Sequence, residues 1–284
     1  MKIAYQGEPG AFSEAAARRV EPEAQLLPSK SFEEVFDRVA AEPATWGVLP
    51  FENSIGGSIH RNYDLLLSHE LPIVGEVELP VVHHLLALPG ATLAGLRRVY
   101  SHPQGLAQCE RFLRTLTNVD IIATYDTAGS AKMVADAGLK DAAAIASARA
   151  GEVFGLASLA ASVQDFDDNI TRFLVIGRKP IRDAVPDKTS IVFSLPNEPG
   201  SLFKALSVFA LRGIDLTKLE SRPIPGRPWE YLFYVDLGVA RDEVTCGRAL
   251  THLGEFAPML RTLGTYASWK TQEGRTPDPF EVVS

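Results

Sequence analysis

The feature that most constrains this chain is a pattern repeated through its first half. A short apolar segment runs into a polar, often glycine-containing turn, and a segment with helical signals follows, as in "KIAY" before "QGEPGAFSEAAARRV". Residues 121–125 repeat it, with Asp126 and Thr127 in the turn and a helix expected to end at Gly138. Strands alternating with helices predict an α/β fold with a largely parallel sheet. Ligands of such sheets bind at the carboxyl ends of the strands, beside helix N-termini, so these polar turns are the expected site.

The chain changes character after Arg178, where a polar, proline-containing stretch reads as a linker. Beyond it, strand and helix patterns follow in the order β-α-β-β-α-β, which predicts an α+β ferredoxin-like domain. The predicted organisation is a first domain at 1–180, a second at 188–270 and a loose tail at 271–284. Within the first domain we expect two lobes, with crossovers near 75–82 and 155–168.

Composition excludes several classes of protein. The 284 residues allow two domains, and 46% hydrophobic with 22% charged residues is ordinary for a globular protein. A formal net charge of -7 argues against a nucleic-acid partner. We expect no membrane association, because no apolar run is long enough to span a bilayer. Two distant cysteines, Cys109 and Cys246, imply no disulfide framework, so a cytoplasmic location is predicted.

The expected strand ends carry hydroxyls, amides and one guanidinium. Each has a purely structural reading as a turn or helix cap, Ser101 being a good N-cap candidate. No metal site is expected, because adjacent His83 and His84 would point to opposite faces of a strand. A small-anion site with Arg172 as a charged clamp fits a two-lobed, periplasmic-binding-protein-like (type II) architecture, and such a site need not be catalytic. The candidate binding residues are Asn53, Ser54, Ser101, Gln108, Thr127, Thr171, Arg172 and Phe173.

Six sequence blocks together have a counterpart in a known family. In register and in order, they resemble prephenate dehydratase over nearly the whole first domain. Each block alone is weak, whereas six at sensible spacing are specific, and the last contains the family's Thr-Arg-Phe signature at 171–173. The blocks are "YQGEPGAFSE", "LPFENSIGGS", "YSHPQGLAQC", "YDTAGSAK", "AAIASARAGEVFGL" and "NITRFLVIG".

The resemblance implies a carbon–oxygen lyase that converts prephenate to phenylpyruvate, carbon dioxide and water, in phenylalanine biosynthesis. It implies no cofactor, and it makes Thr171 the catalytic residue. The other candidates named above become substrate-binding residues. Two alternatives stay open: an arogenate dehydratase, acting on the aminated analogue of prephenate, and a small-anion binding module without turnover.

The second domain resembles the ACT regulatory domain that follows in this family. The resemblance implies L-phenylalanine as an allosteric effector and a homodimer or homotetramer as the assembly. The block at 220–223 reads "ESRP", as in the family, whereas the first ACT block reads "PGSLF" in place of the usual Gly-Ala-Leu-Val, with the larger Phe203 near that pocket. The implied effector-binding residues are Gly200, Ser201, Leu202, Glu220, Ser221, Arg222 and Pro223.

Overall fold

The computed structural model describes residues 1–224 and 226–270. The predicted tail at 271–284 lies outside the described residues. The chain divides into two compact units: Met1–His69 with Val77–Val175, and Glu70–Glu76 with the residues from Ile176 onward. In the described part of the chain, no helix has both the length and the apolar composition needed to cross a membrane.

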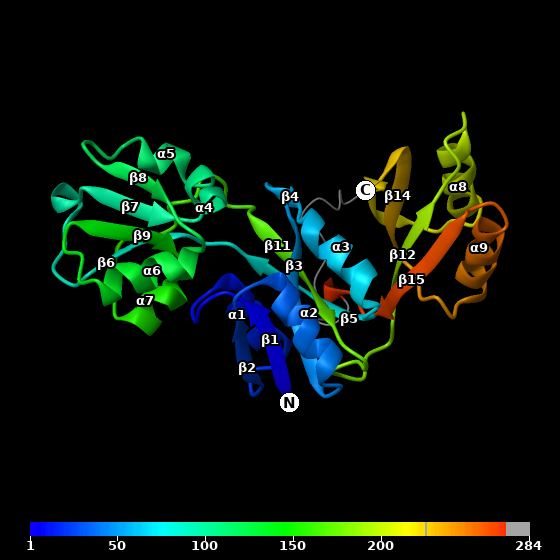
Figure 1. Ribbon diagram of the computed structural model, residues 1–284, viewed down its shortest axis with the longest axis horizontal. Helices are drawn as coiled ribbons and strands as arrows, with labels where there is room; N and C mark the ends of the chain where they lie inside the picture. Colours follow the sequence, from blue (N-terminus) through cyan, green and yellow to red (C-terminus); the bar gives the residue numbers. More distant parts are fainter. Residues whose placement is uncertain (225, 271–284) are drawn as a thin grey trace, which may run out of the picture. The chain divides into compact units, whose positions relative to one another are not determined.

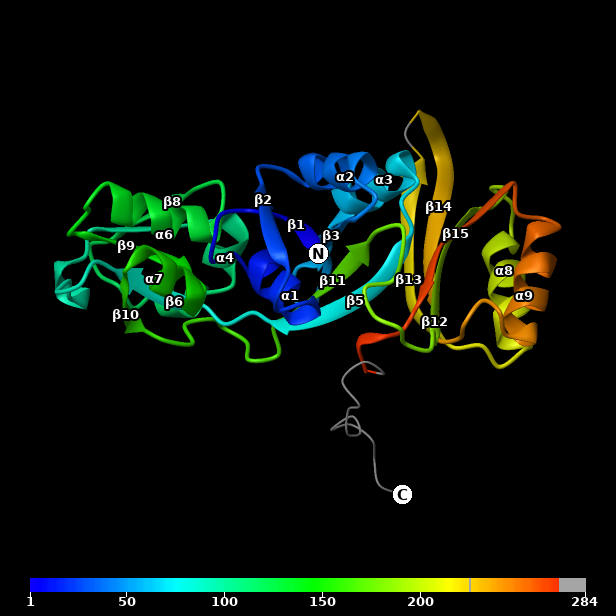
Figure 2. The same ribbon diagram turned by 90° about the horizontal axis from the view of Figure 1, so that it is seen from below.

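The first unit contains the two expected lobes (Figure 1). In the N-terminal lobe, β1 pairs in parallel with β2 and β3, and β11 lies on the other side of β3. Helices α2 and α3 lie on one face of these strands and α1 on the other (Figure 2). The elements are β1 (Lys2–Gln6), α1 (Phe12–Val20), β2 (Gln25–Ser29), α2 (Phe32–Ala41), β3 (Thr45–Asn53), β4 (Gly57–Ser58), α3 (His60–His69), β5 (Ile73–Pro80) and β11 (Ile170–Ile176).

The second lobe has its own sheet, in the order β10-β6-β9-β7-β8. Strands β7, β8 and β9 are parallel, whereas β6 and β10 run antiparallel to their neighbours. Alternate side chains of β9 pack toward α6 and toward α5, so both faces of the sheet are covered. The elements are β6 (His84–Ala87), the 3-10 turn η1 (Leu93–Gly95), β7 (Arg98–Ser101), α4 (Pro103–Ala107), α5 (Glu110–Leu113), β8 (Asp120–Ala123), α6 (Thr127–Asp136), β9 (Ala142–Ala146), α7 (Ala148–Phe154) and β10 (Ala157–Ala160).

The start of α6 follows the signal in the sequence, whereas the start of α4 departs from it. Asp126 is the N-cap of α6, and Ser147 is the N-cap of α7. The prediction that Ser101 caps α4 is wrong. Ser101 is the last residue of β7, and His102 is the N-cap, its Nδ1 accepting from the Gln104 backbone N–H. Pro103 at the first helical position starts the helix there.

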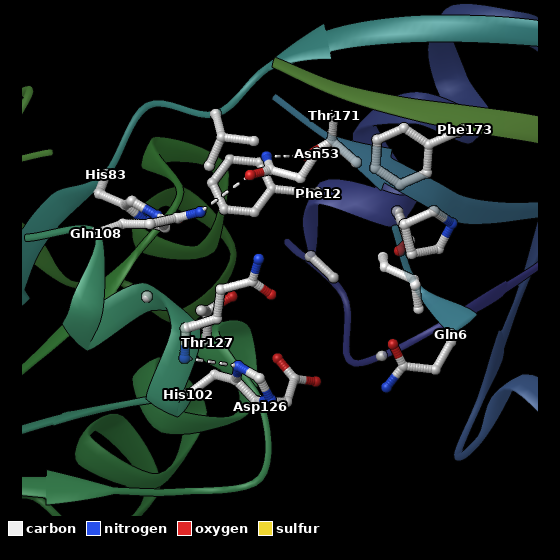
Figure 3. A pocket seen from close by; sticks show the side chains of 18 of the residues that line it. Gln6, Phe12, Asn53, His83, His102, Gln108, Asp126, Thr127, Thr171 and Phe173 are labelled. Carbon is white, nitrogen blue, oxygen red and sulfur yellow. Dashed lines mark hydrogen bonds between the residues drawn. The ribbon is translucent and has the colours of Figure 1, made fainter. Parts of the chain in front are cut away.

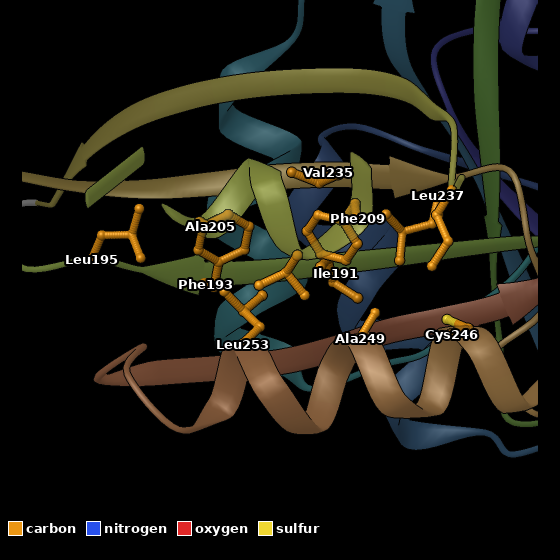
Figure 4. Close-up of a cluster of buried hydrophobic side chains, with 12 residues drawn as sticks. Ile191, Phe193, Leu195, Ala205, Phe209, Val235, Leu237, Cys246, Ala249 and Leu253 are labelled. Carbon is orange, nitrogen blue, oxygen red and sulfur yellow. The ribbon is translucent and has the colours of Figure 1, made fainter. Parts of the chain in front are cut away.

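The second unit has the predicted ferredoxin-like order of elements. Its strands lie in the order β13-β14-β12-β15, with antiparallel neighbours. Helices α8 and α9 supply apolar side chains that pack on one face of this sheet (Figure 4). The elements are β12 (Lys188–Ser194), α8 (Ser201–Ala210), β13 (Leu216–Ile224), β14 (Arg227–Leu237), α9 (Val244–Gly254) and β15 (Met259–Tyr266).

The segment Glu70–Glu76 belongs to the second unit, where it pairs, so β5 is divided: Ile73–Glu76 lies in the second unit and Val77–Pro80 in the first. Ile73 lies opposite Gly264 of β15 in a parallel bridge. A Cβ at Gly264 would lie 2.1 Å from the carbonyl oxygen of Ile73, so only glycine permits this approach. Glu76, 1% exposed in its side chain, pairs with the Lys188 Nζ at 2.7 Å.

Candidate active site

The first unit contains a cavity of about 420 Å³ that takes its lining from both lobes (Figure 3). That volume is in the range of small-molecule sites. Asn53, Gln108, Thr127, Thr171 and Phe173, five of the candidates from the sequence, line it together. The lining also includes polar and aromatic residues outside the candidate set, namely Gln6, Phe12, Ser13, Phe32, His83, His102, Gln104, Tyr125 and Asp126.

Strand alternation divides the Thr-Arg-Phe signature between two faces of β11. Thr171 and Phe173 line the cavity and are buried, whereas Arg172 between them does not line it. The Arg172 Nη1 lies 3.6 Å from the Glu52 Oε2 of β3, with 12% of its side chain exposed. The cavity geometry therefore gives no support to the expectation that Arg172 clamps a substrate carboxylate.

Asn53 connects the end of β3 to Thr171. Its Oδ1 accepts from the backbone N–H groups of Ile55, at 3.1 Å, and Gly56, at 2.7 Å, which fixes the orientation of the amide. The Nδ2 therefore faces β11 and donates to the Thr171 Oγ1 at 2.9 Å. It also donates to the Asn169 Oδ1 at 2.7 Å. Because the Thr171 oxygen is an acceptor in this bond, its own O–H remains available as a donor.

The direction of hydrogen-bond donation can also be assigned at Gln108 and His83. The Gln108 Nε2 lies 3.4 Å from the Asn53 Oδ1, which is already an acceptor, so this end of the amide is the donor. The Gln108 Oε1 then faces the His83 Nε2 at 2.9 Å and requires a proton there. His83 is thus assigned to the tautomer protonated at Nε2.

His83 is buried, with 1% of its surface exposed, and its ring packs edge-on against Phe12. Burial lowers the pKa of His83 below its ordinary value of 6.5, so the ring is neutral at pH 7. Sequence reasoning noted His83 only as half of a His-His pair that cannot share a metal. Its position directly before β6 and one residue after the predicted lobe crossover at 75–82 is the signal that could have pointed to the cavity.

The N-terminus of α6 forms another side of the cavity. The Asp126 Oδ1 accepts from the backbone N–H groups of Ala128, at 2.7 Å, and Gly129, at 3.2 Å. Its Oδ2 accepts from the Glu8 N–H at 3.3 Å, which joins the two lobes. Thr127, the first residue of the helix, lines the cavity beside it.

Two further candidates, Ser54 and Ser101, do not line the cavity. The Ser54 Oγ donates to the Asp168 carbonyl at 2.7 Å and accepts from the Ile170 N–H at 2.9 Å, which ties the start of β11 to the end of β3. Ser101 is fully buried and donates to the Ile145 carbonyl at 2.7 Å. Both hydroxyls form hydrogen bonds within the chain, and these bonds support the strand ends.

Titratable groups near the cavity are few. Burial lowers the pKa of His102, against an opposing effect of Asp126, and raises the pKa of Tyr125. Among the described residues, no group of three or more His, Cys, Asp or Glu side chains is arranged to hold a metal ion. The polar side chains of the described lining are mostly amides and hydroxyls.

The candidate effector residues of the second unit lie on two elements. Gly200 has a positive φ of 82° and precedes α8, whose first residues are Ser201 and Leu202. On β13, Ser221 pairs opposite Phe233 of the helix-covered face, whereas Glu220 pairs opposite Tyr234 on the other face. Arg222 shares the face of Glu220, and Pro223 that of Ser221, so these four side chains do not form one surface.

Comparisons with known proteins agree with this architecture. The family model for prephenate dehydratase matches residues 3–181, and that for the ACT domain matches residues 189–245. A relative from Arabidopsis thaliana, named arogenate dehydratase/prephenate dehydratase 2, chloroplastic, is 50% identical over 279 residues, covering 94% of this chain and 72% of its own.

Two solved structures share the fold along almost the whole chain. Prephenate dehydratase from Arthrobacter aurescens in complex with L-Phe has a TM-score of 0.85 and 31% identity, covering 96% of this chain and 91% of its own. GqqA, described as a novel type of quorum quenching acylase, also has a TM-score of 0.85, with 35% identity and coverage of 99% and 100%.

Proposed function

Because the chain belongs to the prephenate dehydratase family and carries an ACT domain, we propose that its first unit removes carbon dioxide and water from prephenate or from its aminated analogue, in phenylalanine biosynthesis. Prephenate, which would give phenylpyruvate, and arogenate, which would give phenylalanine, are the two candidate substrates of this site. The domain bounds 1–180 and 188–270 are part of this proposal.

The reaction requires stabilisation mainly at one atom, the oxygen of the departing hydroxyl. The bond to the ring carboxylate breaks, carbon dioxide leaves, and the electron pair enters the ring. The carbon–oxygen bond at the opposite ring carbon breaks, and the departing hydroxyl takes a proton that solvent finally supplies. Aromatisation drives the step, so the main requirement is a hydrogen-bond donor at the departing hydroxyl.

The observation that carries the proposal is the hydrogen bond from Asn53 to Thr171. With its oxygen engaged as an acceptor, Thr171 presents its O–H to the cavity, as a donor to a leaving hydroxyl must. Threonine is a very weak acid, so we expect hydrogen-bond donation coupled to bond cleavage rather than a separate proton transfer. Asn53, Gln108 and His83 act through Thr171 by fixing the direction of this bond.

Other lining groups bind and enclose the substrate in this proposal. The rings of Phe12 and Phe173 exclude water from the reacting face. Side-chain amides, Thr127 and the backbone N–H groups at the start of α1, whose N-cap Ala11 offers no side-chain bond, hold the carboxylates. Arg172, Ser54 and Ser101 support the strands that carry these groups.

The test is Thr171→Val, which keeps the shape of the side chain and removes its hydroxyl. In comparable oxyanion sites one donor is worth about 3–4 kcal/mol, so kcat should fall roughly 10²–10³-fold. Substrate binding and the unfolding midpoint should change little. Turnover is measured as phenylpyruvate formed from prephenate, and as phenylalanine formed from arogenate.

Thr171→Ser is the matched control, because it restores a hydroxyl on the same backbone. It should recover most of the turnover that the valine variant loses. Near-normal kcat in Thr171→Val would remove Thr171 from the mechanism, and a folded wild-type protein that converts neither substrate would leave the binding-module alternative.

The similarity to GqqA raises acyl hydrolysis as a rival activity of this cavity. That chemistry needs a nucleophile with a general base in hydrogen-bond reach. The Thr171 Oγ1 is bonded by an amide donor, and the nearest histidine in the hydrogen-bond chain, His83, is separated from it by Gln108 and Asn53. This arrangement favours dehydration, and incubation with an acylated quorum-sensing signal checks the rival directly.

Regulation by phenylalanine through the second unit is also proposed. The ACT match and the L-Phe complex of a family member support it. The expected site involves Gly200, Ser201, Leu202 and the 220–223 block, between copies in a homodimer or homotetramer, since these groups do not form one surface in a single copy. A Ser221→Trp variant should need at least about tenfold more phenylalanine for half of the effect; an unchanged titration would contradict the assignment.

We also propose that the protein is located in a reducing, cytoplasmic environment. Both cysteines, Cys109 and Cys246, are buried and free. Burial raises the pKa of both thiols, that of Cys109 to about 12, which keeps them unreactive. The Arabidopsis relative is named as chloroplastic, so fractionation of the native cells is the measurement that decides location.

A further inference from the structure

The cavity of the first unit has an unusual balance of charge. Among its described lining residues, Asp126 is the single carboxylate and neither lysine nor arginine occurs. Asp126 is 8% exposed, so water screens it poorly. Its carboxylate accepts three backbone hydrogen bonds, two at Oδ1 and one at Oδ2. A carboxylate has about four acceptor sites, so Oδ2 retains one for a donor in the cavity.

Cations near Asp126 do not change this balance. Lys132 pairs with Glu8 at 3.0 Å and is not among the lining residues. His102 does line the cavity, and its burial favours the neutral ring at pH 7. The charge that a ligand meets at this end is therefore negative.

The two candidate substrates differ at one group. Prephenate has a keto group beside its side-chain carboxylate and is a dianion without any positive charge. Arogenate has an ammonium group at that position, which can donate to a carboxylate. A negative group in a poorly screened cavity repels the dianion and attracts the ammonium.

The two ends of the substrate also match the positions of Thr171 and Asp126 in the cavity. In both substrates the departing hydroxyl and the three-carbon side chain are attached at opposite carbons of the ring. Figure 3 shows Thr171 and Asp126 on opposite sides of the cavity, Thr171 on the N-terminal lobe and Asp126 at the start of α6. A substrate that places its hydroxyl at Thr171 therefore directs its side chain toward Asp126.

We propose that Asp126 is a specificity-determining residue that binds the substrate ammonium group, so that this cavity selects arogenate over prephenate. The inference rests on the proposed dehydratase function and names its substrate class. It gives Asp126 a second role beside helix capping, because the Oδ2 site is not needed for the cap.

The experiment compares kcat/KM for arogenate and prephenate in the wild type and in Asp126→Asn and Asp126→Ser. Asparagine and serine are as good N-caps as aspartate, so the start of α6 is retained. The wild type should favour arogenate. Each variant should lose roughly 10- to 100-fold in kcat/KM for arogenate, the value of a hydrogen bond to a charged group, and gain with prephenate.

Asp136→Asn is the matched control. Asp136 is the exposed last residue of α6, so the change removes the same charge from the same helix at a distance from the cavity. Its substrate ratio should equal that of the wild type.

Two results would overturn the inference while leaving the dehydratase function in place. One is a wild type that prefers prephenate, and the other is an equal loss with both substrates in the Asp126 variants, which would reduce Asp126 to a structural cap. Turnover of neither substrate by the folded wild type would instead contradict the proposed function itself.

Discussion

The cavity of the first unit and the core of the second unit are both buried, but they are built from opposite kinds of side chain. The cavity is lined by amides, hydroxyls, two imidazoles and one carboxylate, with aromatic rings between them. The core between the second sheet and helices α8 and α9 consists of apolar side chains and one thiol (Figure 4). Apolar burial stabilises a fold roughly in proportion to area, whereas a buried polar group costs free energy unless it is paired.

This difference separates stability from chemistry. In the second unit, removing a side chain leaves a cavity and weakens the fold without touching a reacting atom. In the first unit, each buried polar group in the chain from His83 to Thr171 fixes the direction of the next hydrogen bond. A change there alters the reaction more than it alters the free energy of unfolding.

The largest expected effect on stability is in the core of the second unit. Phe209 of α8 is fully buried, and Phe209→Ala should lower the free energy of unfolding of that unit by about 3–5 kcal/mol. Urea unfolding followed by circular dichroism measures it. Because chains with more than one domain often depart from two-state unfolding, the transition should be fitted with two steps as well as with one.

Leu211 provides the control for Phe209. It follows α8 directly and is 82% exposed, so Leu211→Ala should change the free energy of unfolding by less than about 0.5 kcal/mol. Dehydratase turnover without phenylalanine should stay within about twofold in both variants. If Phe209→Ala lost its turnover at urea concentrations below its unfolding midpoint, turnover and stability would not be divided between the two units in this way.

At His83 we expect a smaller effect, and one on turnover rather than on stability. His83→Leu removes the donor to the Gln108 Oε1, which releases the amide orientation and should lower kcat about tenfold, the value of one hydrogen bond. His84→Leu is the control, since His84 contacts Ser158 and does not line the cavity. Equal kcat values in the two variants would remove His83 from the positioning chain. Nitrogen-15 spectra of the wild type should show the tautomer protonated at Nε2.

The pH dependence of stability distinguishes His83 further. Burial lowers its pKa in the folded protein below 6.5, so the unfolded chain binds more protons in acid. Its contribution to stability is therefore fully present above pH 6.5 and is lost as the pH falls through that value toward the folded pKa. The slope of unfolding free energy against pH below 6.5 should be flatter in His83→Leu than in the wild type. An identical slope would contradict the buried neutral ring.

The sequence by itself determined the local elements and the type of fold. Alternating strand and helix patterns predicted the α/β class of the first unit, and the β-α-β-β-α-β order predicted the second, because hydrophobic periodicity and turn residues act over short distances. The Thr-Arg-Phe signature and five further blocks identified the family. Asp126, Thr127 and Gly138 marked the limits of α6 correctly.

The tertiary structure alone decided which of the candidate side chains meet. Asn53 and Thr171 are separated by 118 positions, and their contact depends on β3 and β11 lying side by side. The face of β11 that is covered decides that Thr171 and Phe173 line the cavity and Arg172 does not. His83 and Asp126 look in the sequence like a strand residue and a helix cap. Their role at the cavity arises only when two lobes bring distant strand ends together, which no local pattern encodes.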